Sequence, residues 1–278
     1  MTNNLPDELR ILRCPKLENA TLVLAFSGWM DGGDVSTGTV EWLRELLRAQ
    51  PIAEIDPEPF YLLNFPGTME MTALFRPHIK IEDGLIADMD MPSNTFYCHE
   101  PRKIVLFLGK EPNLRWRTFG DCIFRLAHDV GVRHILFVGS FGGAVPHTRE
   151  PRLYVTCSDN KLLAQMQRYG IRRSDYSGPG SFSSYLMSQS KSANLDMTSL
   201  VAEIPGYLHG VNPLSIASIA RRLANFLELS PDFDSLRDAA TAWELKVSAA
   251  LEEDEELAEK VRQLETEYDN DLLDDAVE

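Results

Sequence analysis

Short runs of consecutive apolar residues alternate along the chain with stretches whose apolar positions recur every three or four residues. The apolar runs predict strands buried on both faces, at 21–26, 60–64, 103–108, 134–138, 152–157 and 198–203. The three-to-four spacing predicts helices at 34–48, 117–130, 159–168, 182–190 and 213–228. Two further runs, 79–81 and 85–89, flank Asp83-Gly84 and predict a β-hairpin. Because strands alternate with helices, we expect an α/β protein, a three-layer α/β/α sandwich with a mostly parallel sheet.

After Pro231 the pattern changes to a single long helical segment from Leu236 to about Tyr268. Its apolar positions are spaced alternately by four and three residues and are interrupted at Asp254, as in a coiled coil. The predicted oligomer seam consists of Val247, Leu257, Val261 and Leu264. The alternative is a helix that lies on its own domain. We therefore divide the chain into an α/β/α core domain (1–230), a C-terminal helical extension (231–268) and an acidic tail (269–278) expected to be disordered.

The net charge of −15 is concentrated at one end of the chain. Residues 252–278 hold thirteen Asp and Glu against Lys260 and Arg262, a balance of −11, so the rest of the chain carries about −4. This acidity argues against nucleic-acid binding, which depends on neutralising phosphates. No apolar run approaches the roughly 20 residues that a membrane helix needs. The expected location is the cytoplasm, because the N-terminus lacks a signal-peptide layout and the cysteines lack paired spacing, at Cys14, Cys98, Cys122 and Cys157.

The most informative loop follows the apolar run Ile135–Val138. The chain there passes Gly139, Gly142 and Gly143 and reaches a polar segment ending in His147-Thr148-Arg149. Loops that leave strand ends are where ligands bind in open α/β sheets. This loop and similar ones supply the candidates for a ligand or partner site, which are Trp29, Glu111, Trp116, His147, Arg149 and Tyr176. No metal site and no cofactor are expected.

These residue types would suit a small-molecule enzyme. His147 could act as acid or base near neutral pH, and Arg149 could hold a phosphate or carboxylate. Trp116 could stack on a base or sugar, and Glu111 could bind a ribose hydroxyl. However, the sequence contains no nucleophile elbow, metal triad or phosphate loop. The structural alternatives are that His147 caps a turn or joins an ion pair, Arg149 pairs with Glu150 or Glu111, and Trp116 anchors the core.

Six motifs in one order carry a family resemblance. They are 26–33 (FSGWMDGG), 111–116 (EPNLRW), 145–149 (VPHTR), 176–180 (YSGPG), 204–207 (IPGY) and 212–213 (NP). Together they resemble the proteasome assembly chaperone 2 family over about 18–268, and 264–269 looks like the ending of its bacterial branch. The resemblance implies a fold similar to purine nucleoside phosphorylases with an added C-terminal helical part. It also implies homo-oligomers, trimers among them.

Bacterial relatives have been described as chaperone-like and, by distant analogy, as ATP-grasp or carboxylate–amine ligases. Archaeal family members that dock on the proteasome end in a hydrophobic residue, a tyrosine and one more residue. This chain ends Asp275-Ala-Val-Glu278, which argues against docking by such a tail.

Two functions remain after this comparison. The favoured one is a chaperone-like or protein-binding homo-oligomer with a protein partner. The other is an enzyme acting on a nucleoside or carboxylate, or an ATP-dependent carboxylate–amine ligase. An enzyme should gather Glu111, His147 and Arg149 around one enclosed pocket. A binding protein should use these side chains structurally and expose an apolar patch of several hundred Å².

Overall fold

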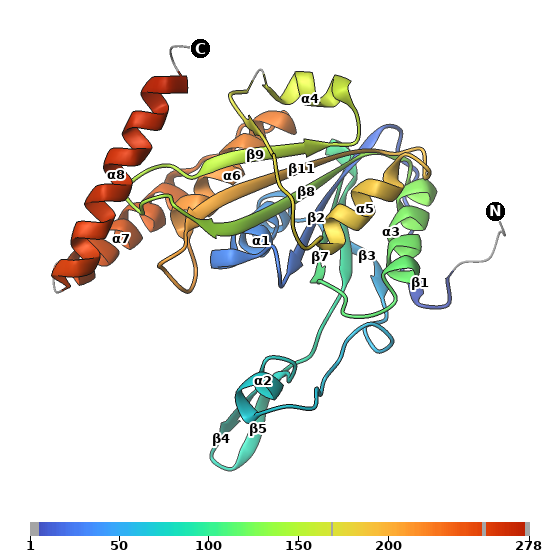
Figure 1. The fold of residues 1–278 in the computed structure, drawn as a ribbon. Helices are drawn as coiled ribbons and strands as arrows, with labels where there is room; N and C mark the ends of the chain where they lie inside the picture. Colours follow the sequence, from blue (N-terminus) through green and yellow to red (C-terminus); the bar gives the residue numbers. More distant parts are fainter. Residues whose placement is uncertain (1–5, 168, 252–253, 276–278) are drawn as a thin grey trace.

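The computed structural model describes residues 6–167, 169–251 and 254–275. Its body is a nine-stranded sheet in the order β1-β3-β6-β7-β2-β8-β11-β9-β10 (Figure 1). The strands are β1 (Leu9–Ile11), β2 (Ala20–Ser27), β3 (Gln50–Ile55), β6 (Thr95–His99), β7 (Ile104–Lys110), β8 (Val132–Gly143), β9 (Arg152–Cys157), β10 (Arg172–Arg173) and β11 (Asp196–Pro205).

The centre of this sheet, β7-β2-β8-β11, is parallel throughout, and the predicted α/β/α class is confirmed. Antiparallel pairs occur toward the edges, where β3, β6 and β9 join. Residues 60–64 do not form the predicted strand. Phe60 is fully buried in a loop, so its apolar run reflects burial without strand pairing. β3 and β6 were not predicted. β8 runs on through Gly143, where we had expected a loop.

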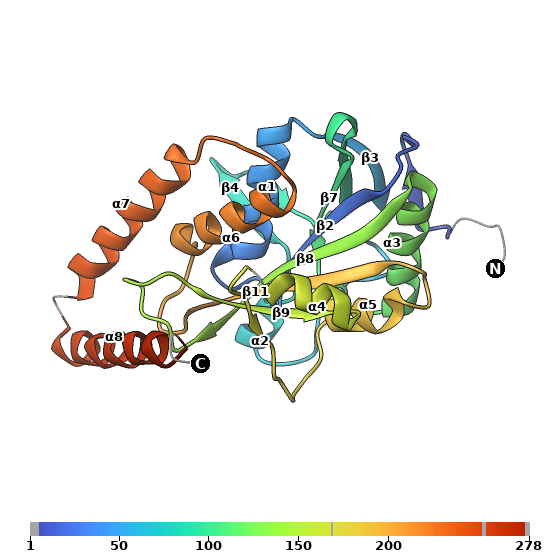
Figure 2. The ribbon, with the colours of Figure 1, turned by 90° about the horizontal axis from the view of Figure 1, so that it is seen from above.

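Helices cover both faces of the sheet (Figure 2). On one face, α3 (Trp116–Val130) and α5 (Phe182–Ser190) bury a core rich in phenylalanine. On the other, α1 (Val35–Leu47) and α6 (Pro213–Phe226) cover aliphatic residues, and α4 (Asn160–Gln167) lies beside β9. β2 serves both faces, because Leu22, Leu24 and Phe26 point to one and Val23 and Ala25 to the other.

Residues 63–91 leave the body and form a projecting arm (Figure 1). The arm contains α2 (Met69–Ala73) and the hairpin of β4 (His78–Glu82) and β5 (Leu85–Asp90), which is separate from the main sheet. The predicted hairpin and its turn are confirmed. Asp83 and Gly84 both have positive φ, as a two-residue hairpin turn of the favoured type requires.

The C-terminal part is not the single long helix that we predicted. It consists of α7 (Asp234–Leu251) and α8 (Glu255–Asp275), which diverge in Figure 2. Asp254 begins the second helix, because its carboxylate accepts a hydrogen bond from the backbone N–H of Leu257 at 3.0 Å. Residues 269–275 of the expected disordered tail are helical, and 276–278 lie outside the described residues. None of the described helices is long and apolar enough to cross a membrane.

Candidate functional site

Glu111, at the end of β7, connects two loops. Its carboxylate accepts a hydrogen bond from the backbone N–H of Trp29 at 3.1 Å and another from that of Phe182 at 2.6 Å. The second donor lies at the start of α5, where the helix dipole favours a negative charge. Both carboxylate oxygens are therefore engaged within the fold, which gives Glu111 a structural role.

The three aromatic candidates separate into one anchor and two exposed rings. Trp116 donates its indole N–H to the carbonyl of Pro112 at 2.7 Å and packs edge-on against Phe182. These contacts agree with the alternative that Trp116 anchors the core and does not stack on a ligand. Trp29 and Tyr176 are 63% and 67% exposed, so their rings remain available to a partner.

His147 is buried between the body and α7, with 2% of its surface exposed. Its Nδ1 lies 2.8 Å from the hydroxyl of Tyr207, and its Nε2 lies 3.0 Å from that of Ser248. The Tyr207 oxygen also accepts the backbone N–H of His147 at 2.9 Å. The tautomer decides which ring nitrogen donates, and in either tautomer both ring nitrogens have a partner inside the fold.

Burial also lowers the pKa of His147, with the nearby carboxylate of Glu265 acting in the opposite direction. The ring is thus held neutral beside α7. Its contacts join the body to the C-terminal helices.

Arg149 also binds the C-terminal helices. Its guanidinium makes two hydrogen bonds of 2.9 Å to the carboxylate of Asp269, which holds the pKa of that carboxyl below its usual range. Glu265 lies within ion-pair distance of Arg149 and accepts a hydrogen bond from Thr148. Arg149 therefore pairs with α8, and not with Glu150 or Glu111 as the structural alternative had it.

Sequence reasoning missed Glu203, which is buried near the end of β11. Its carboxylate accepts hydrogen bonds from the backbone N–H of Ala144 at 2.8 Å and from the hydroxyl of Tyr154 at 3.1 Å. A Cβ on Gly143 would collide with this carboxylate, so the glycine admits Glu203 beside the strand. The sequence did contain a signal for this residue, because Glu203 is the one acidic residue in the predicted buried strand 198–203.

The arm presents an amphipathic hairpin that was also missed as a surface. Ile79 stands opposite Met89, and Ile81 stands opposite Ile86 after a register shift that skips Ala87. The shift brings Ile86 and Met89, three residues apart, to the same face as Ile79 and Ile81, and these four side chains are here called the apolar arm face. All four are exposed, from 43% for Ile79 to 67% for Ile86. The opposite face carries the Lys80–Asp88 and His78–Asp90 pairs. Met69, Leu74 and Leu85 add further exposed apolar surface to the arm.

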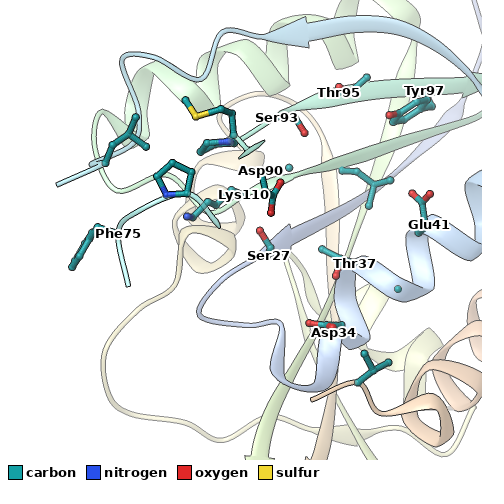
Figure 3. A pocket seen from close by; sticks show the side chains of 18 of the residues that line it. Ser27, Asp34, Thr37, Glu41, Phe75, Asp90, Ser93, Thr95, Tyr97 and Lys110 are labelled. Atoms are coloured by element: carbon teal, nitrogen blue, oxygen red, sulfur yellow. The ribbon is translucent and has the colours of Figure 1, made fainter. Parts of the chain in front are cut away.

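A cavity of about 600 Å³ lies where the arm joins the body (Figure 3). It is lined by residues of the arm, of α1 and of the ends of β2 and β7. None of Glu111, His147 and Arg149 lines it. The structure therefore does not gather these three residues around this cavity, and the contacts that they make are structural.

A model of the PAC2 family matches residues 25–251, which is most of the chain. The chain therefore belongs to the PAC2 family, and the resemblance found in the motifs is confirmed. No curated protein matches the chain.

Among solved structures, a proteasome-assembly chaperone homologue of Mycobacterium tuberculosis is 30% identical, with a TM-score of 0.73, covering 87% of this chain and 99% of the other. A PAC2 family protein of Streptomyces avermitilis is 26% identical, with a TM-score of 0.72, and the match covers 87% and 100%. A protein of unknown function from M. tuberculosis is 21% identical, with a TM-score of 0.84, and the match covers 99% of this chain and 93% of the other. The last similarity extends the shared fold across almost the whole chain.

Proposed function

We propose that this chain is a chaperone-like, protein-binding member of the PAC2 family that acts in the cytoplasm as a homo-oligomer. The apolar arm face is the observation that carries the proposal. The similarity to a proteasome-assembly chaperone homologue supports it. The structural contacts of Glu111, His147 and Arg149 give no support to the small-molecule enzyme.

The hairpin has the pattern of a sheet that is covered on one face. Apolar and polar residues alternate along β4, with Ile79 and Ile81 on one face and Lys80 and Glu82 on the other. Every described residue of both strands is exposed. An isolated two-stranded hairpin is marginally stable in water, and its stability rises when an apolar face is packed against another surface. The arm therefore requires cover from another protein surface.

A second copy of the chain is the first partner that we propose, with a trimer as the expected assembly. The arm comprises 29 residues (63–91), and a stable protein interface uses about 20–30 residues a side. A different protein, such as a proteasome subunit of the same organism, is the second partner. Nucleic acid is disfavoured because the arm is acidic, with five Asp and Glu against Arg76 and Lys80.

The test compares two double variants on opposite faces of the hairpin. Ile81→Ser with Ile86→Ser removes the apolar pair, whereas Lys80→Ser with Asp88→Ser changes the polar pair beside it. Light scattering should show a multiple of 31.3 kDa for the natural chain and the polar variant, and the monomer mass for the apolar variant. An apolar variant with unchanged mass would refute assembly through the arm. Co-elution with purified proteasome subunits of the same organism, lost in the apolar variant alone, would support the second partner.

The oligomer seam predicted from the sequence remains a separate proposal, although the structure places Val247 on α7 and Leu257, Val261 and Leu264 on α8. Val261 is buried within its own chain, and Leu257 and Leu264 are half-buried. Assembly through this seam would compete with those contacts. Leu257→Asp with Leu264→Asp should lower the oligomer mass without unfolding the body if the seam mediates assembly, and an unchanged mass would exclude that role.

A further inference from the structure

The cavity at the base of the arm lies at the point in the sheet where ligands bind in open α/β folds. Its two neighbouring strands, β2 and β7, lead into helices on opposite faces, α1 and α3. Such a reversal opens a crevice beyond the carboxyl ends of the strands. Ser27 and Lys110, the last residues of β2 and β7, both line the cavity. Its volume of about 600 Å³ is within the usual range for small-molecule sites.

The charged side chains that line the cavity are three carboxylates and one lysine. Figure 3 shows the carboxylates of Asp34, Glu41 and Asp90 around the hollow, with Lys110 as the labelled cationic side chain. Glu41 pairs with Arg44. Within the described residues, the side chains of Asp34 and Asp90 form neither an ion pair nor a hydrogen bond. Two carboxylates, one from the body and one from the arm, are therefore available to a ligand.

The availability of Asp34 has a specific cause. The sequence places Asp34 where it would cap α1, yet its backbone is left-handed and its side chain makes no capping bond. Asp31 does this instead, because its carboxylate accepts hydrogen bonds from the backbone N–H of Thr37 at 3.1 Å and from its hydroxyl at 2.7 Å. Asp34 is thus released from a structural role and lines the cavity.

The remaining walls combine hydroxyl groups with apolar surface. Ser27 and Thr37 lie between Asp90 and Asp34 in Figure 3. Apolar side chains come mainly from the arm and from the α6 region, and include Leu63, Phe75, Met91, Val211 and Ile216. A bare metal ion would leave these apolar walls unused. An amine or guanidinium on a short hydrocarbon chain or ring would use both kinds of wall.

We propose that this cavity binds an organic cation, a primary amine, amidine or guanidinium carried on a small apolar body, between Asp34 and Asp90. The charged end is held by the two free carboxylates, as charge-assisted hydrogen bonds favour. The apolar body packs against the arm side of the cavity. This binding is independent of the protein partner proposed for the apolar arm face, because that face lies on the hairpin and its four residues do not line the cavity.

Benzamidine, benzamide and benzoate provide matched probes, because they share a ring and differ in charge. Isothermal titration with the full chain should show benzamidine binding at least tenfold more tightly than benzamide, and no binding of benzoate. Agmatine is the second cationic probe, with an aliphatic body. Benzamidine and agmatine should each raise the melting temperature, since a ligand of the native state stabilises it.

Variants locate the binding. Asp34→Asn and Asp90→Asn should each weaken benzamidine binding at least tenfold, and circular dichroism should show both variants folded, since neither side chain is used within the fold. Asp121→Asn, an exposed acid on α3, is the control and should bind as the natural chain does. Equal binding of benzamide and benzamidine, or no binding of either cation, would overturn the proposal. So would binding that persists in the Asp34→Asn, Asp90→Asn double variant, which would indicate adventitious association with the acidic C-terminal segment.

Discussion

The arm and the C-terminal helices are both appended to the same sheet, but they relate to it in opposite ways. The C-terminal helices are held by polar bonds to the body, among them His147–Ser248, Arg149–Asp269 and Arg152–Asp271. The arm's described side-chain hydrogen bonds join arm residues to one another, such as Thr72 to Phe65 and Arg76 to Asn64. The C-terminal helices are thus tied to the body by side-chain bonds, whereas the described side-chain bonds of the arm stay within the arm.

The largest expected difference is between the melting temperatures of two deletion variants, one without the C-terminal helices and one without the arm. Removal of 234–278 uncovers His147 and loses the buried side chains of Leu251, Val261 and Tyr268, worth about 5 kcal/mol together. The melting temperature should fall by about 10 °C or more, as measured by calorimetry. Replacement of 64–90 by a short glycine–serine linker should change it by only a few degrees. Equal losses would show that the arm is part of the folded core.

Tyr268 tests the attachment of α8 at a single residue. Its ring is buried under the guanidinium of Arg152, and its hydroxyl donates a hydrogen bond to the carbonyl of Glu150 at 2.9 Å. Tyr268→Ala should reduce the free energy of unfolding by about 3 kcal/mol in a denaturant titration. Leu272→Ala, on the exposed part of the same helix, should change it little. A Tyr268→Ala variant as stable as the natural chain would mean that α8 is not held at this point.

His147 should make the attachment of α7 sensitive to pH. Its pKa is lowered in the folded state, so its contribution to stability is complete above about pH 6.5. That contribution is lost as the pH falls, because the unfolded chain then binds a proton that the folded chain excludes. The stability difference between the natural chain and His147→Gln should therefore be larger at pH 7.5 than at pH 5.

Comparing the natural chain with His147→Gln also cancels the effect of a second titrating group, Asp31. Burial raises the pKa of Asp31 to about 6, and its contribution to stability therefore falls as the pH rises from about 4 to 6. Asp31 is present in both proteins, so its effect cancels from the difference. A difference that is constant between pH 5 and 7.5 would show that His147 does not titrate differently on folding.

Arg149 should give the smallest effect. Its pairs with Asp269 and Glu265 are partly exposed, and such pairs contribute about 1 kcal/mol or less. Arg149→Gln should lower stability slightly at low salt and by less at high salt, where the charges are screened. A loss as large as that for Tyr268→Ala would mean that the ion pairs, and not the packing, hold α8.

Much of the fold could be predicted because its central strands are covered on both faces. The predicted strands 21–26 and 134–138 lie within β2 and β8, and 103–108 overlaps β7 from Ile104 onward. The hairpin turn at Asp83-Gly84 was visible as a pair of residue types. Phe60 misled the prediction, because burial alone produces the same apolar run as a strand. At the start of α8, the Asp254 carboxylate accepts a hydrogen bond from the backbone N–H of Leu257. The spacing of apolar residues marked Asp254 as an interruption but did not predict that the helix would end there.

The candidate site was less predictable, because residue type does not reveal which partner a side chain finds. Glu111 and Arg149 are suitable for chemistry by type, but distant parts of the chain engage them, Phe182 and Asp269 respectively. The apolar arm face depends on a register shift that skips Ala87 and places Ile86 opposite Ile81, because a regular strand would point Ile86 and Met89 to different faces.

The position of β2 has a consequence for how the chain is made. β2 ends at Ser27 and lies between β7 and β8, and β8 must then pair with β11, which ends at Pro205. Synthesis from the N-terminus therefore completes the arm hairpin, at Asp90, long before the sheet can close. Hairpins form in about 1–10 μs, whereas elongation adds about 5–20 residues each second. The nascent chain thus displays its apolar arm for seconds before its own core exists.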